Sequence, residues 1–193
     1  PPIGGLNGPD IYTFTTIADA EALMQTASSA KKALIVGAGL IALKAAEALH
    51  MRGLDVTLVV RSRIMRVYFD EAAGNMLVKH LEKKGIKFAQ GATPQAVLRN
   101  KDGRVTGLDT DKGELEADFI VMAAGVRPRK ELAEAAGLTT GLGIVVNDHM
   151  QTSDLDIFAA GDVTEAAEML TGEPVVMPIW PNAYNQGVNA GLN

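Results

Sequence analysis

The 193-residue chain contains no cysteine. Within this stretch a disulfide framework, a thiolate metal site and a dithiol redox couple are therefore excluded. The chain has three histidines, at His50, His80 and His149. They are scattered and lack the spacing of metal ligands, so we predict no metal site.

The chain also lacks a long apolar run and an excess of positive charge. No run approaches the roughly 20 residues of a membrane-spanning helix, and no basic stretch followed by an apolar one opens the N-terminus. The net charge is −5, which disfavours non-specific nucleic-acid binding because such binding needs a basic face to displace counterions. We expect a cytoplasmic protein that binds neither nucleic acid nor a membrane.

The most informative stretch is a strand, a tight turn and a helix that the hydrophobic pattern predicts over 33–49. Gly37 permits the sharp turn, Gly39 leaves room for a pyrophosphate, and the small Ala42 lets the helix pack close to the strand. The helix N-terminus then offers free N–H groups and partial positive charge to a phosphate. The same glycines would also serve as a simple short connection, and the turn alone does not choose between these interpretations.

The second strand, predicted over 55–60, ends without the acidic residue that an NAD-preferring site places about twenty residues beyond the glycines. Val60 is followed instead by Arg61, Arg63 and Arg66. Three arginines in an acidic chain form a cationic pocket suited to the 2′-phosphate of NADPH. The alternative is a solvated loop of ordinary surface arginines, and the glycine turn upstream favours the phosphate clamp.

The rest of the pattern indicates an α/β fold. A helix over 70–84 and a strand over 86–89 continue the βαβαβ rhythm of a parallel sheet. Period-two alternation over 96–117 predicts an antiparallel β-meander in place of one crossover helix. The apolar run 118–125 is typical of a parallel strand buried on both faces.

Two later stretches suit the carboxyl edge of such a sheet. An apolar strand is predicted over 156–163, with Gly161 and Asp162 near its end. The carboxylate of Asp162 would accept hydrogen bonds from a sugar hydroxyl, or alternatively it would cap a following helix. A last helix is predicted to begin at or near Asn182.

The ordered set of motifs resembles the FAD-dependent pyridine nucleotide-disulfide oxidoreductase superfamily, which includes disulfide reductases, NADH oxidases, and rubredoxin or ferredoxin reductases. The motifs are G-A-G-L-I-A-L-K-A-A-E, E-K-K-G-I, V-M-A-A-G-V-R-P, D-I-F-A-A-G-D-V and N-A-Y-N-Q-G-V-N-A-G. The likeness extends over nearly the whole chain.

The resemblance implies an FAD/NAD(P)-binding, Rossmann-like fold in which an NAD(P)H domain is inserted into a discontinuous FAD domain. Residues 1–14 would be the linker from a first FAD half that this sequence lacks. Residues 15–126 would be the NAD(P)H-binding domain, and 127–193 the returning, incomplete part of the FAD domain. We therefore expect a piece of a longer protein, in keeping with a first residue that is Pro1 and not Met.

The resemblance also assigns cofactor contacts. The residues around the NAD(P)H pyrophosphate would be Gly37, Ala38, Gly39, Leu40 and Ile41. The adenosine side would hold Val60, where NADH-using relatives have Glu, and Arg61, Arg63 and Arg66. The nicotinamide side would hold Ala124, Gly125 and Val126, and the flavin side Gly161, Asp162 and Val163. Lys44 stands where the family pattern has Glu, which weakens any transfer of detailed hydride geometry.

The implied parent is an FAD-dependent NAD(P)H oxidoreductase that passes hydride to FAD and electrons on to a disulfide, O2 or a small redox protein. Its cofactors would be FAD and NADP, with NAD as the alternative, and it would be a homodimer. No residue of this stretch is assigned a catalytic role, and the fragment alone would bind nucleotide without turnover. The alternatives are a non-catalytic regulatory or electron-transfer docking subunit, and a free-standing dehydrogenase, for which no Tyr–Lys or His–Asp pairing is evident.

Overall fold

The computed structural model describes residues 3–193, so Pro1 and Pro2 of the expected linker lie outside the described residues. The chain divides into two compact units, one that ends at Gly125 and one that runs from Val126 to Asn193. The assignment of these units to NAD(P)H and FAD binding stays a prediction.

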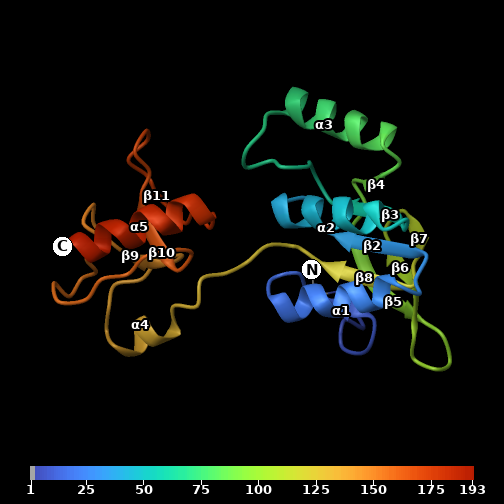
Figure 1. The fold of residues 1–193 in the computed structure, drawn as a ribbon, viewed down its shortest axis with the longest axis horizontal. Helices are drawn as coiled ribbons and strands as arrows, with labels where there is room; N and C mark the ends of the chain where they lie inside the picture. Colours follow the sequence, from blue (N-terminus) through green and yellow to red (C-terminus); the bar gives the residue numbers. More distant parts are fainter. Residues whose placement is uncertain (1–2) are drawn as a thin grey trace. The chain divides into compact units, whose positions relative to one another are not determined.

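The first unit alternates strands and helices and then inserts a run of antiparallel strands (Figure 1). In chain order its elements are β1 (Ile11–Tyr12), α1 (Ile17–Ala27), β2 (Lys32–Val36), α2 (Leu40–Met51), β3 (Asp55–Val60), α3 (Glu71–Lys83), β4 (Lys87–Gln90), β5 (Pro94–Arg99), β6 (Val105–Thr110), β7 (Gly113–Glu116) and β8 (Phe119–Met122). Five strands form a parallel sheet in the order β1-β8-β2-β3-β4, and three form an antiparallel sheet in the order β5-β6-β7. The predicted α/β fold with a β-meander crossover is confirmed.

Alternation along the central strands gives the parallel sheet two buried faces. In β2, Ala33 and Ile35 pack with residues of α1 and α2, whereas Leu34 and Val36 pack with Leu108 of the antiparallel sheet. Successive side chains of a strand point to opposite faces, so a continuous apolar run is buried on both sides. The unit therefore has three layers, with the parallel sheet between the helices α1, α2 and α3 on one face and the antiparallel sheet on the other.

Helix α1 begins with a capping box. The Oγ1 atom of Thr16 accepts a hydrogen bond from the Asp19 backbone N–H (3.1 Å), and Oδ2 of Asp19 accepts one from the Thr16 N–H (3.0 Å). Oδ2 of Asp19 also accepts from the Thr15 N–H (2.8 Å) and from the hydroxyls of Thr15 and Thr13 (both 2.9 Å). The Thr15 backbone bond, followed by those hydroxyls, holds the pKa of the Asp19 carboxyl well below its usual range.

Asp19→Asn is expected to lower the melting temperature at pH 7, because the amide loses the charge that these donors stabilise. A depressed pKa in the folded state contributes stability above the unfolded Asp value of about 3.9 and loses it as pH falls. The difference from wild type should therefore shrink below about pH 4. Thermal melts from pH 7 to pH 2.5 measure it. Glu21→Gln, on the same helix, is the control; an equal and pH-independent loss in both variants would contradict the prediction.

The second unit is small and rich in loops. Its elements are α4 (Glu131–Ala135), β9 (Ile144–Val145), β10 (Thr164–Ala167), β11 (Pro174–Val175) and α5 (Trp180–Leu192). The strands form a sheet in the order β11-β10-β9. The predicted last helix is confirmed, and it begins at Trp180.

The prediction of an apolar strand over 156–163 is wrong. In the described chain Phe158 forms an isolated bridge with Gln151, and the next strand, β10, begins at Thr164. Gly161 has φ +89°, a left-handed conformation that turns the chain before a strand can continue. The alternative role of Asp162 as a helix cap is also wrong, because β10 follows it and not a helix.

Helix α5 directs amide side chains toward its own unit. Oε1 of Gln186 accepts a hydrogen bond from the Gly161 N–H (2.8 Å), and Nδ2 of Asn189 donates to the Asp148 carbonyl (2.6 Å). The exposed apolar side chains of the helix are Trp180, Tyr184, Val188 and Leu192. Within the described residues, the apolar face of α5 is therefore uncovered. In residues 3–193 no helix has the length and hydrophobicity needed to cross a membrane.

Candidate nucleotide-binding site

The turn between β2 and α2 has a shape that only glycine allows at its first position. Gly37 has φ +152°, and a Cβ built on it would lie 2.2 Å from the Ala123 carbonyl oxygen and 2.7 Å from its carbon. That carbonyl is fixed, because the Ala123 N–H donates to the Val36 carbonyl (2.9 Å) at the end of β2. Gly37 is thus required for β8 to approach the turn.

Gly39 leaves open space beside the start of α2. It is the N-cap residue of the helix with an ordinary φ of −94°, no side chain caps the helix, and a Cβ at this position would have no atom within 4 Å. The side chains of Leu40 and Ile41 are exposed, whereas Ala42 is fully buried. The first N–H groups of a helix have no intrahelical acceptor, so an anion can approach them here.

The loop after β3 folds back on this turn. Val60 is buried, and the Met65 N–H donates to the Ala38 carbonyl (2.7 Å). Met65 has φ +50°, an uncommon left-handed conformation for a side chain of this kind. This hydrogen bond ties the predicted arginine loop to the predicted pyrophosphate turn, which lie far apart in the sequence.

The loop carries three cations. Arg61 and Arg66 are exposed and Arg63 is half-buried, with its Nη2 atom donating to the Arg66 carbonyl (3.2 Å). Among residues 3–193 no carboxylate forms an ion pair with any of them. Ser62, between two of these arginines, adds an exposed hydroxyl. The loop therefore presents hydrogen-bond donors and positive charges that no carboxylate of the described residues neutralises.

The predicted nicotinamide-side residues follow β8 at the same edge. Ala124, Gly125 and Val126 are all exposed, and Gly125 has φ +117°. Val126 is the first residue of the second unit. Lys44 on α2 pairs with Glu47 (3.0 Å), and its hydrogen bond lowers the pKa of the Glu47 carboxyl.

In the second unit, the predicted flavin-side residues form a turn held by α5. Besides the Gly161 N–H, Oε1 of Gln186 accepts from the Thr164 hydroxyl (3.0 Å). Asp162 is exposed and Val163 is half-buried. Sequence reasoning placed the helix over 182–190 near the flavin but did not single out Gln186 within it.

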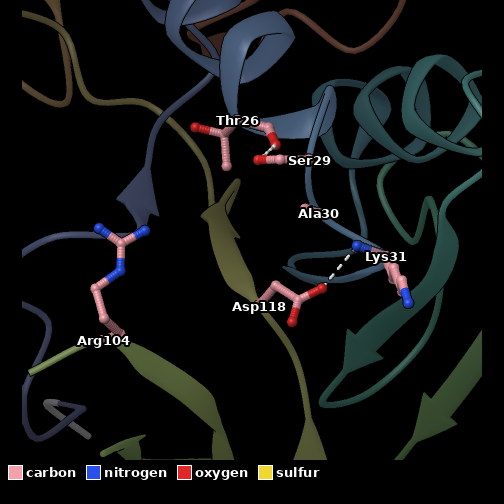
Figure 2. Close-up of a pocket in the computed structure, with 6 residues that line it drawn as sticks. All are labelled: Thr26, Ser29, Ala30, Lys31, Arg104 and Asp118. Carbon is pink, nitrogen blue, oxygen red and sulfur yellow. Dashed lines mark hydrogen bonds between the residues drawn. The ribbon is translucent and has the colours of Figure 1, made fainter. Parts of the chain in front are cut away.

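An open pocket of about 400 Å³ lies at the opposite, amino end of β2 and β8 (Figure 2). It is lined by Thr26, Ser29, Ala30, Lys31, Arg104 and Asp118. The Asp118 carboxylate already accepts hydrogen bonds from the Lys31 (2.7 Å) and Lys32 (2.9 Å) N–H groups. These groups hold the fold together, so the candidate site remains the glycine turn and the arginine loop. Within the described chain no group of histidine and carboxylate side chains is arranged to hold a metal ion.

A family model described as pyridine nucleotide-disulphide oxidoreductase matches residues 1–187. The assimilatory nitrate reductase electron transfer subunit of Bacillus subtilis is 40% identical over 195 residues, which cover 96% of this chain and 23% of that protein. The water-forming NADH oxidase of Lactobacillus brevis bound to NADH is 30% identical with a TM-score of 0.92, covering 100% of this chain and 43% of that one. Its engineered NADPH oxidase variant, bound to NADPH, is 33% identical with a TM-score of 0.91 and the same coverage. The chain spans less than half the length of these relatives.

Proposed function

The chain belongs to the pyridine nucleotide-disulphide oxidoreductase family, and we propose that it is the nucleotide-binding portion of an FAD-dependent oxidoreductase that uses NADPH. The observation that carries the proposal is the arginine loop, which the Met65–Ala38 hydrogen bond holds against a glycine turn that is open to a ligand. The helix N-terminus would bind the pyrophosphate, and the arginines would bind the 2′-phosphate.

The engineered NADPH oxidase supports the choice of NADPH. In the engineered enzyme, alanine replaces a glycine of the NADH oxidase. Eighteen positions later three successive residues are replaced as well: aspartate by alanine, alanine by arginine and methionine by serine. In this chain Ala42 is also eighteen positions before Val60, which is followed by Arg61 and Ser62. The last substitution in that enzyme, proline to arginine, falls five positions after the serine. That spacing corresponds to Val67, next to Arg66.

The residues of the second unit fit a flavin. An exposed carboxylate, Asp162, follows a left-handed turn at Gly161, and Gln186 holds that turn in place. Asp162 would accept hydrogen bonds from the sugar-like chain of FAD. When bound, FAD would supply the hydride-accepting and electron-transfer chemistry. The chain's own residues would bind and orient the two cofactors.

A parallel titration of the full chain with NADPH and NADH tests the nucleotide assignment. We expect NADPH to bind at least about tenfold more tightly at low salt, because charge-assisted bonds to the 2′-phosphate are absent with NADH. The preference should weaken as salt is raised, since exposed charges are screened. Tighter binding of NADH would overturn the NADPH assignment, and binding of neither would overturn the proposed site.

The electron acceptor stays unassigned between a disulfide, O2 and a small redox protein. The Bacillus subtilis relative is described as an electron transfer subunit, so an electron-transfer role within a larger assembly is the second candidate function. Cytoplasmic location and a homodimeric parent stay predictions. The sequence of the complete protein would decide between the two functions, because an upstream glycine turn for FAD favours the enzyme.

A further inference from the structure

Residues 3–10, expected to be a linker, are tied to the antiparallel sheet. The Gly4 N–H donates to the Gln95 carbonyl and the Val97 N–H donates to the Gly4 carbonyl, both at 2.8 Å. This segment, which we call the connector, therefore pairs with β5 through one isolated parallel bridge, between Gly4 and Ala96. A freely moving linker would not make this pair of backbone hydrogen bonds.

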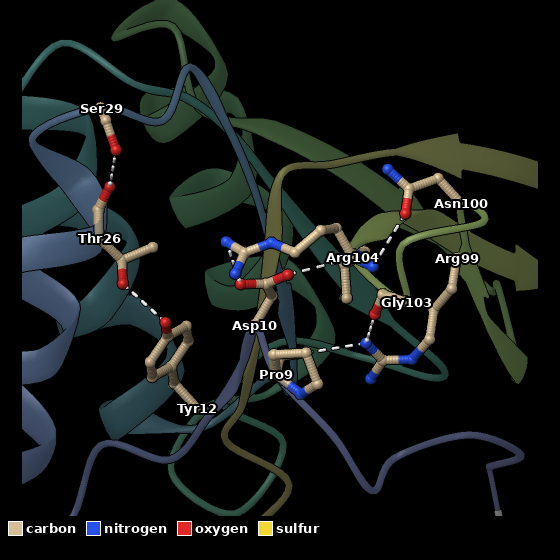
Figure 3. Close-up of polar contacts among 10 residues, drawn as sticks. Pro9, Asp10, Tyr12, Thr26, Ser29, Arg99, Asn100, Gly103 and Arg104 are labelled. Atoms are coloured by element: carbon tan, nitrogen blue, oxygen red, sulfur yellow. Dashed lines mark hydrogen bonds and ion pairs between the residues drawn. The ribbon is translucent and has the colours of Figure 1, made fainter.

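Arg99 of β5 binds the connector from the side (Figure 3). Its Nη1 atom donates to the carbonyls of Pro9 (2.9 Å) and Gly103 (2.7 Å), and Nη2 donates to the Gly5 carbonyl (3.3 Å). One guanidinium thus joins the connector to the β5–β6 turn.

The connector ends at an ion pair between the buried Asp10 and the exposed Arg104, also shown in Figure 3. Asp10 is 4% exposed, and its Oδ1 atom lies 2.7 Å from Nη2 of Arg104. Oδ2 accepts a hydrogen bond from the Val105 N–H (3.2 Å), and the Asp10 carbonyl accepts one from the Ile120 N–H of β8 (2.9 Å). Asp10 therefore joins the antiparallel sheet to the parallel sheet.

Two features of Asp10 are costly and point to a specific role. Its φ of +67° is left-handed, and its carboxylate is almost fully removed from water. Arg104, whose side chain is 61% exposed, is the cation that compensates it. Removing Arg104 would leave the buried Asp10 carboxylate without its cation, so the pair is the point at which the connector would open.

We propose that the antiparallel sheet is a clamp that fixes how the chain enters the nucleotide-binding unit, with Arg104 as the positioning residue that closes it through Asp10. Strand β1 follows Asp10 directly and has two residues paired with β8, too few to hold the edge of the sheet alone. When the clamp opens, the connector and β1 leave together, while the central strands stay folded.

Hydrogen exchange on the full chain tests this clamp. In Arg104→Met, exchange of the amides that bond across the clamp, those of Gly4, Val97, Val105 and Ile120, should rise at least about tenfold, while exchange in β3 stays at the wild-type rate. Arg104→Lys should restore part of the protection because it keeps a cation. NADPH affinity should stay within about twofold of wild type, since the opening is local.

The matched control is Tyr12→Phe, which removes a neighbouring hydrogen bond, between the Tyr12 hydroxyl and Oγ1 of Thr26 (2.7 Å), without touching the ion pair. It should leave exchange over 3–10 unchanged. Wild-type protection of the connector in a folded Arg104→Met would overturn the proposal, as would a connector that exchanges freely in wild type. If Arg104→Met does not fold, Arg104→Lys decides, because it keeps a cation near Asp10 and should still raise exchange at Gly4 and Val105 above the wild-type rate; wild-type exchange in that variant would overturn the proposal.

Discussion

Gly37→Ala is expected to destabilise the first unit by about 3 kcal/mol or more and to abolish measurable NADPH binding. The added Cβ would lie 2.2 Å from the Ala123 carbonyl oxygen, and the backbone φ of +152° is one that alanine rarely adopts. To relieve this clash, either β8 must move away from β2 or the turn must change shape. Either change disrupts the edge of the sheet where the nucleotide would lie. Urea unfolding and NADPH titration of the same sample measure both effects.

Gly39→Ala is the matched control, with the same chemical change two residues away. A Cβ at Gly39 meets no atom within 4 Å, and its φ of −94° suits alanine. The stability loss should stay near the roughly 1 kcal/mol of replacing a helix N-cap with alanine. NADPH affinity should nevertheless fall at least about tenfold, because the methyl group occupies the space of the pyrophosphate. Wild-type affinity in Gly39→Ala would show that no phosphate approaches this residue.

The glycine turn was predictable because its determinants are local. A strand that ends at Val36, a residue such as Gly37 that tolerates an unusual φ, and an apolar helical pattern all lie within one short stretch of sequence. The burial of both faces of the sheet was equally predictable, since the continuous apolar run 118–125 is typical of a strand covered on both sides. The meander was predictable from its period-two pattern and its Gly-containing turns.

Contacts between distant residues were not predictable in this way. Nothing in the pattern showed that the Met65 N–H would donate to the Ala38 carbonyl, or that Asp10 would be buried against Arg104. The failure at 156–163 has a related cause. A short apolar run such as Ile157–Ala160 is compatible with a strand or with a packed loop. In the structure it is a loop, held by backbone hydrogen bonds such as the one from the Thr152 N–H to the Ile157 carbonyl (2.9 Å).

Arg61→Glu is expected to lower NADPH affinity about 100-fold and to change NADH affinity less than about threefold. The substitution removes a charge-assisted donor and places a carboxylate where the 2′-phosphate would bind, so the lost attraction and the new repulsion add. NADH has a hydroxyl at that position, and this hydroxyl can donate a hydrogen bond to the new carboxylate. Titration with both nucleotides at one ionic strength measures the change in preference.

Arg52→Glu separates a local effect from the change in net charge. Arg52 is exposed and stands at the C-cap of α2, a helix of 12 residues whose N-cap is Gly39, so it lies about 18 Å along the helix from the turn. Arg52→Glu changes the net charge as much as Arg61→Glu does. It should lower NADPH affinity by less than about threefold, because salt at 0.1 M screens charges that lie more than about 10 Å apart. If NADPH affinity fell equally in both variants, the effect would come from the net charge of the chain and not from a local contact of Arg61. An unchanged NADPH affinity in Arg61→Glu would make the arginine an ordinary surface residue, and the choice between NADPH and NADH would then depend on Arg63, Arg66 and Ser62.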